Sequence, residues 1–138
     1  MSSVDIKLSE SSVSTLSSNL RKKMQTVKDA AHAEINSFTN QVFDSAQQRV
    51  PTVTGALAAS GHISEHNTDD VLKRIIGYGT SLTNPVTGKT TESYAVEKHE
   101  IENPKNPDSY KWLERTMLDN ADEFLQRMAS AISGGLNG

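Results

Sequence analysis

The sequence of 138 residues contains no cysteine, and it is poor in apolar and aromatic residues. Without cysteine the chain can form neither a disulfide framework nor a zinc–thiolate site, and a reducing cytoplasm suits it. Hydrophobic residues make up 35% of the chain and aromatic residues 5%, which is little material for a core. We therefore expect that part of the chain projects from the folded body, or that neighbouring subunits complete the burial.

The chain also has neither a large excess of one sign of charge nor a long apolar run. The formal net charge is -3, too small to indicate an electrostatic nucleic-acid binder. No apolar run approaches the ~20 residues that cross a bilayer. The N-terminus lacks the basic start and apolar stretch of a signal peptide. The sequence therefore predicts a soluble protein that stays where it is made, with a single domain over residues 1–138.

The first part of the chain predicts an extended arm and then one long helix. Residues 4–8 alternate between apolar and polar, so residues 1–10 are predicted to be an N-terminal arm or a short strand. Ser9 can cap a helix, and neither glycine nor proline follows until Pro51. Apolar residues recur at steps of three or four along the helix: Val13, Leu16, Leu20, Met24, Val27, Ala31, Ile35, Phe38, Val42 and Ala46.

A helix of this length has consequences for assembly. About 40 residues make a helix of ~60 Å, which few domains of 138 residues can cover by themselves. We expect its first turns to fray or to pack against another subunit. The steps of the apolar pattern drift from a strict heptad, which argues against a coiled coil.

The middle of the chain predicts a small antiparallel sheet of about three to four strands. Residues 57–63, 71–78 and 93–99 are the predicted strands, and a polar turn separates the first two. Residues 81–91, with Asn84-Pro85 and Gly88, predict an exposed loop.

The end of the chain predicts a second helix. Asn106-Pro107 supplies a cap residue followed by a proline suited to the first helical turn. One apolar face follows, and Gly134-Gly135 is predicted to end the helix, leaving residues 134–138 as a disordered tail. The predicted fold class is therefore α+β, with a long N-terminal helix, a small sheet, and a C-terminal helix packed on the sheet.

Residues 62–66 contain a string that resembles a catalytic motif. His62, Glu65 and His66 match the inverted zinc-protease pattern H-x-x-E-H. That chemistry needs both histidines on one face of a helix. Gly61 and the polar turn instead predict a strand, which separates the two histidines by ~13 Å. We expect surface residues here and no metal ion.

The other candidate motifs lack the neighbouring residues or the structural context that their chemistry requires. Thr87-Gly88-Lys89-Thr90 resembles the end of a phosphate-binding loop, but Thr83 stands where the motif needs a glycine. No serine lies in a G-x-S-x-G elbow. His99, beside Glu97 and Glu100, could act as an acid–base group, but a strand-end histidine is more often solvated or hydrogen-bonded. We expect no enzyme activity and no cofactor.

Three segments stand out by their order. Residues 51–60 read P-T-V-T-G-A-L-A-A-S and follow the long helix; residues 94–100 read Y-A-V-E-K-H-E; and residues 110–115 read Y-K-W-L-E-R. From Gln25 to Ile132 the chain resembles the tail-completion or neck proteins of long-tailed double-stranded-DNA bacteriophages, which are minor structural proteins of the head–tail joint. Their pattern is a helix, P-x-[DT]-T-G-x-L-R-x-S, a hairpin, a Y-A strand leading to H-E or E-x-G, and a helix that opens with an aromatic residue, Leu and Glu.

Two positions depart from the family pattern. Val53 stands where an acidic residue is usual, and Ala58 stands where arginine is frequent, which puts a salt bridge at that turn in doubt. The roles we expect for the matching residues are structural: Gly55 for a sharp reversal, Leu57 at an inward-facing strand start, and Tyr94 and Trp112 as anchors. The full set of motif residues is Thr54, Gly55, Leu57, Ser60, Tyr94, Ala95, Glu97, His99, Trp112, Leu113 and Glu114.

The resemblance implies a structural protein of the virion. Its expected partners are further copies of itself in a ring, most often a hexamer, the head-side connector or stopper protein, and the tail terminator or tail tube protein. DNA is expected to pass through such a ring without specific contact. We expect the long helix and the loop at 81–91 to make many of the contacts.

Three alternatives stay open at this point. The closest is a tail terminator ring, which the sequence separates poorly from a neck ring. A small metal-dependent hydrolase would use His62, Glu65 and His66. A DNA-contacting module would use the basic cluster of Arg21, Lys22 and Lys23, for which a solvated helix face is the plainer interpretation.

Overall fold

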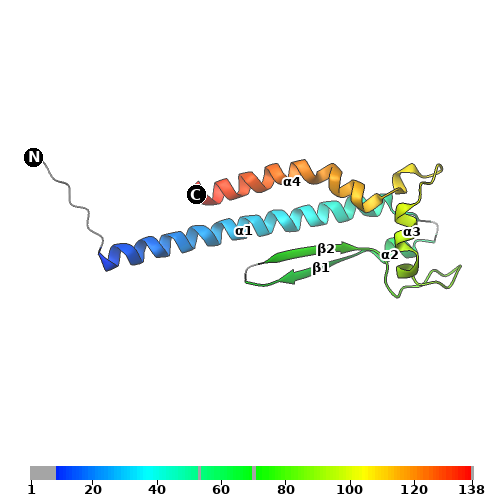
Figure 1. Cartoon of the computed structure of the whole chain (residues 1–138), viewed down its shortest axis with the longest axis horizontal. Coiled ribbons are helices and arrows are strands. Elements are labelled where there is room, and N and C mark those ends of the chain that lie inside the picture. The colour runs from blue at the N-terminus through cyan, green and yellow to red at the C-terminus, as the bar shows by residue number, and fades with distance from the viewer. Residues whose placement is uncertain (1–8, 53, 70, 138) are drawn as a thin grey trace, which may run out of the picture.

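The computed structural model describes residues 9–52, 54–69 and 71–137. Their order along the chain is helix, short helix, hairpin, short helix, long helix (Figure 1). The elements are α1 (Glu10–Arg49), α2 (Ala56–Ala59), β1 (His62–Asn67), β2 (Leu72–Gly77), α3 (Ala95–Glu100) and α4 (Trp112–Asn137), with single 3-10 turns at Thr91–Ser93 and Pro107–Ser109. The predicted class, α+β with a long N-terminal helix, a small antiparallel sheet and a C-terminal helix, is confirmed. The C-terminal helix was expected to pack on the sheet, but α4 packs against α1 instead. The predicted arm at residues 1–8 lies outside the described residues.

Local sequence signals set both ends of α1. The Ser9 side chain accepts a hydrogen bond from the Ser12 backbone N–H at 3.1 Å, and Glu10 lies at the positive end of the helix dipole. Val50, which precedes Pro51, adopts extended backbone angles, as steric contact with the proline ring demands. The helix of 40 residues is therefore ~60 Å long, as predicted.

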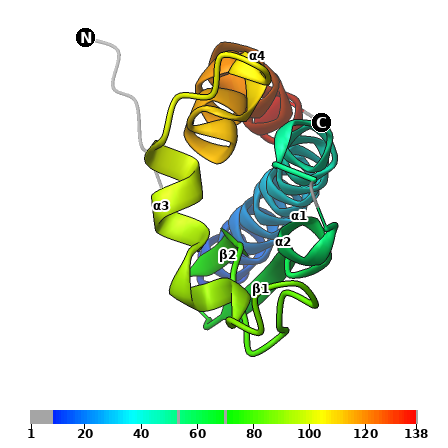
Figure 2. The same cartoon turned by 90° about the vertical axis from the view of Figure 1, so that its right-hand side faces the viewer.

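The helix α4 runs beside α1 over most of its length (Figure 1). Phe38 and Phe124 stack with their ring centroids 4.3 Å apart, and the Gln41 amide donates to Asn120 at 2.7 Å. Ion pairs flank this seam: Arg127 with Glu34 at 3.0 Å and Arg49 with Asp119 at 2.9 Å. The hairpin lies on another side of α1, so α1 separates the sheet from α4 (Figure 2).

The prediction that α4 ends at Gly134-Gly135 is wrong, because the helix continues to Asn137. Residues 134–137 are therefore helical rather than a disordered tail. Gly135 is buried against α1, where a Cβ atom would lie 2.9 Å from Val27 Cγ2 and 3.0 Å from Val27 Cα. The absent side chain lets the two helix backbones approach closely. Lys23 Nζ then donates to the carbonyl of Leu136 at 3.1 Å, at the negative end of the α4 dipole.

The sheet is a two-stranded antiparallel hairpin, one or two strands smaller than predicted. Its register pairs His62 with Gly77 and Asn67 with Leu72. Arg74 fixes the hairpin to α1, and its side chain is only 5% exposed. The guanidinium donates to Asn36 at 2.9 Å and lies 3.0 Å from His32 Nε2.

The third predicted strand, at residues 93–99, is wrong because Ala95–Glu100 forms α3. Alanine, glutamate and lysine are strong helix formers, and the acidic residue of the first turn and the basic residues of the last suit the helix dipole. Residues 57–63 were also expected to be one strand. Their alanine-rich start forms α2, and β1 begins only at His62.

The buried core is small and lies where α1 ends. It consists of Ala46, Val50, Leu57, Ala95 and Trp112, which we call the junction core. This agrees with the low apolar content of the sequence. From this end the two long helices extend away together, and α1 projects past the end of α4 (Figures 1 and 2).

Candidate functional site

The junction core brings together the three segments that carry the family resemblance. Leu57 comes from the first segment, Ala95 from the second and Trp112 from the third, and all three are at least 93% buried. Tyr94 and Leu113, from the second and third segments, are partly buried against the same cluster. Motif residues far apart in the sequence thus meet in the fold, and most of them have packing roles.

The first segment reverses the chain after α1. Gly55 has a φ of +78°, a left-handed conformation that glycine adopts without steric cost. The Thr54 hydroxyl accepts from the Ala56 backbone N–H at 3.3 Å. Ser60 is buried; its hydroxyl donates to the Leu57 carbonyl at 2.6 Å and accepts from the Gly79 N–H at 2.9 Å. This serine therefore ties α2 to the end of the hairpin. Val53 lies outside the described residues.

Aromatic rings connect the hairpin end, α3 and α4. Trp112 meets Tyr78 edge-on with centroids 5.5 Å apart, and it meets His99 edge-on at 4.9 Å. The Tyr78 hydroxyl donates to Gln47 at 2.9 Å, and burial raises the pKa of Tyr78 to about 12. Among the described residues, the Tyr94 hydroxyl and the Trp112 indole N–H are buried without a hydrogen-bond partner.

His99 contacts the start of α4 through its side chain. Its Nδ1 lies 2.9 Å from the Glu100 carboxylate, and its Nε2 accepts from the Glu114 backbone N–H at 3.4 Å. A proton on Nδ1 satisfies both contacts. The hydrogen bond from His99 is the main cause that lowers the pKa of Glu100, with the charge of Lys111 adding to it. The hydrogen bond to Glu114 is the main cause that raises the pKa of Lys111.

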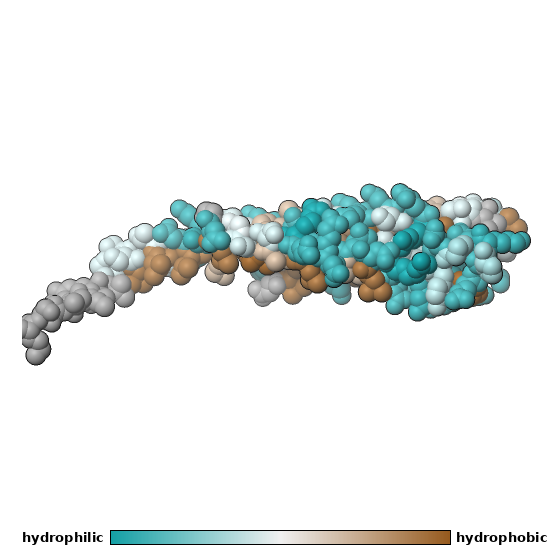
Figure 3. Space-filling model, turned by 90° about the horizontal axis from the view of Figure 1, so that it is seen from above, coloured by the Kyte–Doolittle hydropathy of each residue, from teal (hydrophilic) through white to brown (hydrophobic). Residues whose placement is uncertain are grey.

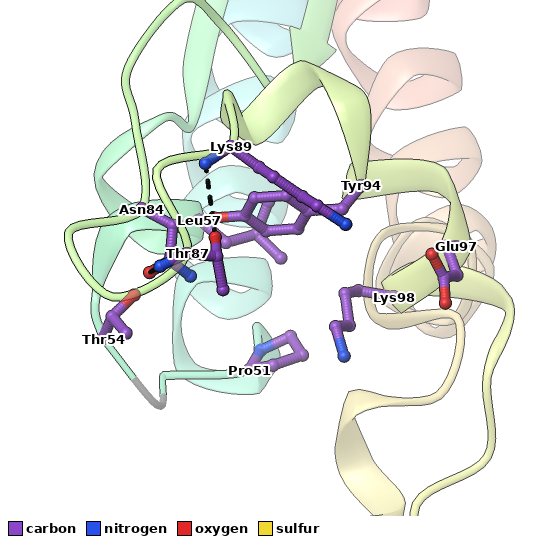
Figure 4. Close-up of a pocket in the computed structure, with 9 residues that line it drawn as sticks. All are labelled: Pro51, Thr54, Leu57, Asn84, Thr87, Lys89, Tyr94, Glu97 and Lys98. Atoms are coloured by element: carbon purple, nitrogen blue, oxygen red, sulfur yellow. Dashed lines mark hydrogen bonds between the residues drawn. The ribbon is translucent and has the colours of Figure 1, made fainter.

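A cavity of about 320 Å³ opens beside the junction core (Figure 4). Pro51, Leu57 and Tyr94 line it on one side, and the charged side chains at it are Lys89 from the loop and Glu97 and Lys98 from α3. All three charged residues are exposed. Exposed charges at a rim suit contact with another surface better than a desolvated reaction centre.

The loop predicted at residues 81–91 is mostly exposed, but its last residue, Thr91, is buried in a 3-10 turn. The backbone N–H groups of Val86 and Thr87 donate to the Asn84 side chain, and that of Gly88 donates to the Asn84 carbonyl. The Lys89 N–H donates to the Thr87 hydroxyl at 3.3 Å. A phosphate-binding loop points such groups at its ligand, whereas here they are used within the loop.

The H-x-x-E-H string lies on β1, in extended backbone. Because strand residues alternate between faces, Glu65 points to the opposite face from His62 and His66. Glu65 lies 3.6 Å from Arg74, and His62 Nδ1 lies 2.9 Å from the Ser60 carbonyl. Within the described ranges no three His, Cys, Asp or Glu side chains are grouped as metal ligands would be.

The basic cluster on α1 has structural contacts. Lys23 donates to the Leu136 carbonyl, and Lys28 Nζ donates to the Asp69 carbonyl at 3.1 Å. Lys23 of the cluster thus contacts the end of α4, and Lys28, further along α1, contacts the tip of the hairpin. For Arg21 and Lys22 no ion pair forms with any residue that the structure describes.

Two apolar stripes remain open on the long helices. The α1 stripe covers the projecting section of α1 (Figure 3) and consists of Val13, Leu16, Leu20 and Met24, each more than half exposed. A hollow of about 740 Å³ between α1 and the hairpin tip adjoins it at Met24. The α4 stripe consists of Leu118, Leu125, Ile132 and Leu136, each more than a third exposed. Leu125 and Ile132 were expected on the single apolar face of the second helix, but they lie on this exposed stripe; the steps of seven residues from Leu118 to Ile132 are a readable signal for it.

Comparison with protein-family models, curated proteins and solved structures found no match for this chain. Of the helices that the structure describes, none has the length and apolar character needed to cross a membrane.

Proposed function

We propose that this protein is a structural component of a tailed-phage virion, a neck or tail-completion protein that forms a ring between the tail and the head-side connector. The observation that carries the proposal is the junction core. The three segments on which the family resemblance rests supply Leu57, Ala95 and Trp112 to one cluster. Three short motifs that meet in space make a more specific resemblance than the same motifs scattered over the surface.

The distribution of apolar side chains also supports an assembly role. Few apolar side chains are buried among the described residues, while the α1 and α4 stripes are open to solvent. Exposed apolar patches of this kind mark interaction surfaces. A ring protein works through shape and contact surfaces, so a small core and two open stripes suit it.

Deletion of the gene from the phage that encodes it tests the proposal. We expect lysates with DNA-filled heads and separate tails, and we expect purified protein to restore joined, infectious particles when added to such a lysate. Joined particles in the absence of the protein would contradict the proposal.

A truncation tests the part assigned to α1. Removal of residues 1–20 leaves the section of α1 that α4 covers, since α4 ends beside Lys23 and Val27. We expect a folded chain with unchanged tryptophan fluorescence that cannot join tails to heads. If the truncated chain still yields infectious particles, the contact assigned to the projecting section is wrong.

A further inference from the structure

The α1 stripe continues the seam between the two long helices. Val27, the next apolar position after Met24, is covered by Gly135 of α4. The helix α4 ends at Asn137, so the same face of α1 is left open from Met24 back to Val13. The open section spans 11 residue steps, or ~16 Å of helix. A second helix that packs on this open face of α1 would extend the helix–helix packing that α1 already makes with α4.

The α4 stripe is also an exposed apolar surface on a helix, and it lies on another part of the chain. Leu118, Leu125, Ile132 and Leu136 are spaced by seven, seven and four residues along ~27 Å of helix. Val13 and Leu20 are likewise seven apart, Leu16 lies three residues after Val13, and Met24 lies four residues after Leu20. Two stripes with this spacing can interlock as in paired helices.

The charges beside the two stripes have opposite sign. From Glu10 to Lys28, α1 carries four basic residues and one acidic residue, whereas α4 carries four acidic residues and two basic ones. Asp122 flanks the α4 stripe, and it forms no ion pair with the residues that the structure describes. Pairing α1 with α1 of another copy would bring Arg21 and Lys22 near like charges. Pairing it with α4 brings opposite charges together.

Within one chain the α1 stripe cannot reach Leu125, in the middle of the α4 stripe. Phe124, next to Leu125, stacks on Phe38 of α1 with centroids 4.3 Å apart. Phe38 lies 22 residues along α1 from Leu16, which corresponds to ~33 Å. A contact between the α1 stripe and Leu125 therefore joins two copies of the chain.

We infer that the α1 stripe of one copy packs on the α4 stripe of a second copy of this chain. The contact is head-to-tail, because each copy uses a different surface on its two sides, and repeated contacts of this kind form a ring when the rotation from copy to copy closes. The inference rests on the proposed ring and names the surfaces that form it.

Disulfide trapping tests the contact, since the chain has no cysteine of its own. We expect Leu16→Cys and Leu125→Cys, mixed and oxidised, to form a covalent dimer at least five times faster than Leu16→Cys mixed with Val96→Cys. Val96 is 76% exposed on α3 and supplies the matched control for random collision. A single chain with both Leu16→Cys and Leu125→Cys should give a ladder of larger species.

Two results would overturn the contact. One is a mixture that forms dimer no faster than the Val96→Cys control. The other is Leu16→Cys alone forming dimer faster than the mixture, which would assign the α1 stripe to α1 of the second copy. The reduced variants are also added to the gene-deleted lysate. Restored joining without trapping would refute this contact alone, whereas wild-type protein that fails to restore joining refutes the proposed function.

Discussion

Gly135 offers the sharpest test of how the two long helices pack. In Gly135→Ala the new Cβ would lie 2.9 Å from Val27 Cγ2 and 3.0 Å from Val27 Cα, against ordinary contacts of about 3.5–4.0 Å. The helices must separate locally by about 0.5–1 Å. Overpacking of this kind costs about 1–3 kcal/mol, and the better helix propensity of alanine offsets at most about 1 kcal/mol of it. We expect a net loss of about 1–2 kcal/mol in the free energy of unfolding.

Gly134 is the matched control, because a Cβ there meets nothing within 4 Å. Gly134→Ala should stabilise the chain by up to about 1 kcal/mol through helix propensity alone. Urea unfolding followed by circular dichroism and by tryptophan fluorescence measures both variants. In a double variant, Val27→Ala should restore part of the loss, since it removes Cγ2 but leaves Cα. Equal stability of the Gly134→Ala and Gly135→Ala variants would refute the close approach of α4 to α1.

Further predictions concern the junction core and the hairpin, each measured by urea unfolding except where stated. Tyr94→Phe should raise the free energy of unfolding by up to about 1 kcal/mol because it removes an unpaired buried hydroxyl, whereas Tyr78→Phe should lower it by about 1 kcal/mol because the hydrogen bond to Gln47 is lost. Burial raises the pKa of Tyr78 to about 12, so its neutral form stabilises the fold. This contribution to stability is complete below pH 10 and is lost as the pH rises through about 12. Tyrosinate absorbance should show the ionisation of Tyr78 as a late step that is missing from Tyr78→Phe. Leu57→Ala should cost about 2–5 kcal/mol, and a cost under 1 kcal/mol would contradict its place in the core. Arg74→Ala should cost about 2–4 kcal/mol and speed hydrogen exchange in β2, and unchanged exchange would show that Arg74 does not hold the hairpin.

The elements with strong local signals could be predicted from the sequence. Ser9 and Pro51 mark the two ends of α1. The predicted start of the second helix is wrong, because Asn106 makes no capping hydrogen bond, Pro107 opens a single 3-10 turn, and α4 begins only at Trp112. The hairpin was also predicted, because a polar turn separates two apolar runs. Each of these signals acts within a few residues of the element that it sets.

The wrong predictions fall where tertiary contacts or weak local preferences determine the secondary structure. Gly135 would end a helix in isolation, but Val27, more than 100 residues earlier in the chain, covers it and keeps it helical. Residues 95–100 carry an ambiguous pattern in which Val96 suggests a strand, although that side chain is exposed in α3.

For the candidate site, too, the residues of local motifs could be predicted, whereas the contacts between distant segments could not. The family pattern contains Leu57, Ala95 and Trp112, three of the five residues of the junction core, but it did not show that the three segments meet. The polar contacts of Arg74 with His32 and Asn36 were missed, although the two α1 residues lie four apart and so share one face of the helix.

The position of the protein in a purified virion tests the central proposal most directly. Cryo-electron microscopy of particles from the phage that encodes it should place a closed ring of this chain between the tail and the head-side connector, with α1 of each copy against α4 of the next. A ring that caps the tail tube would assign it to the tail terminator instead. Particles that lack the protein altogether would contradict the account.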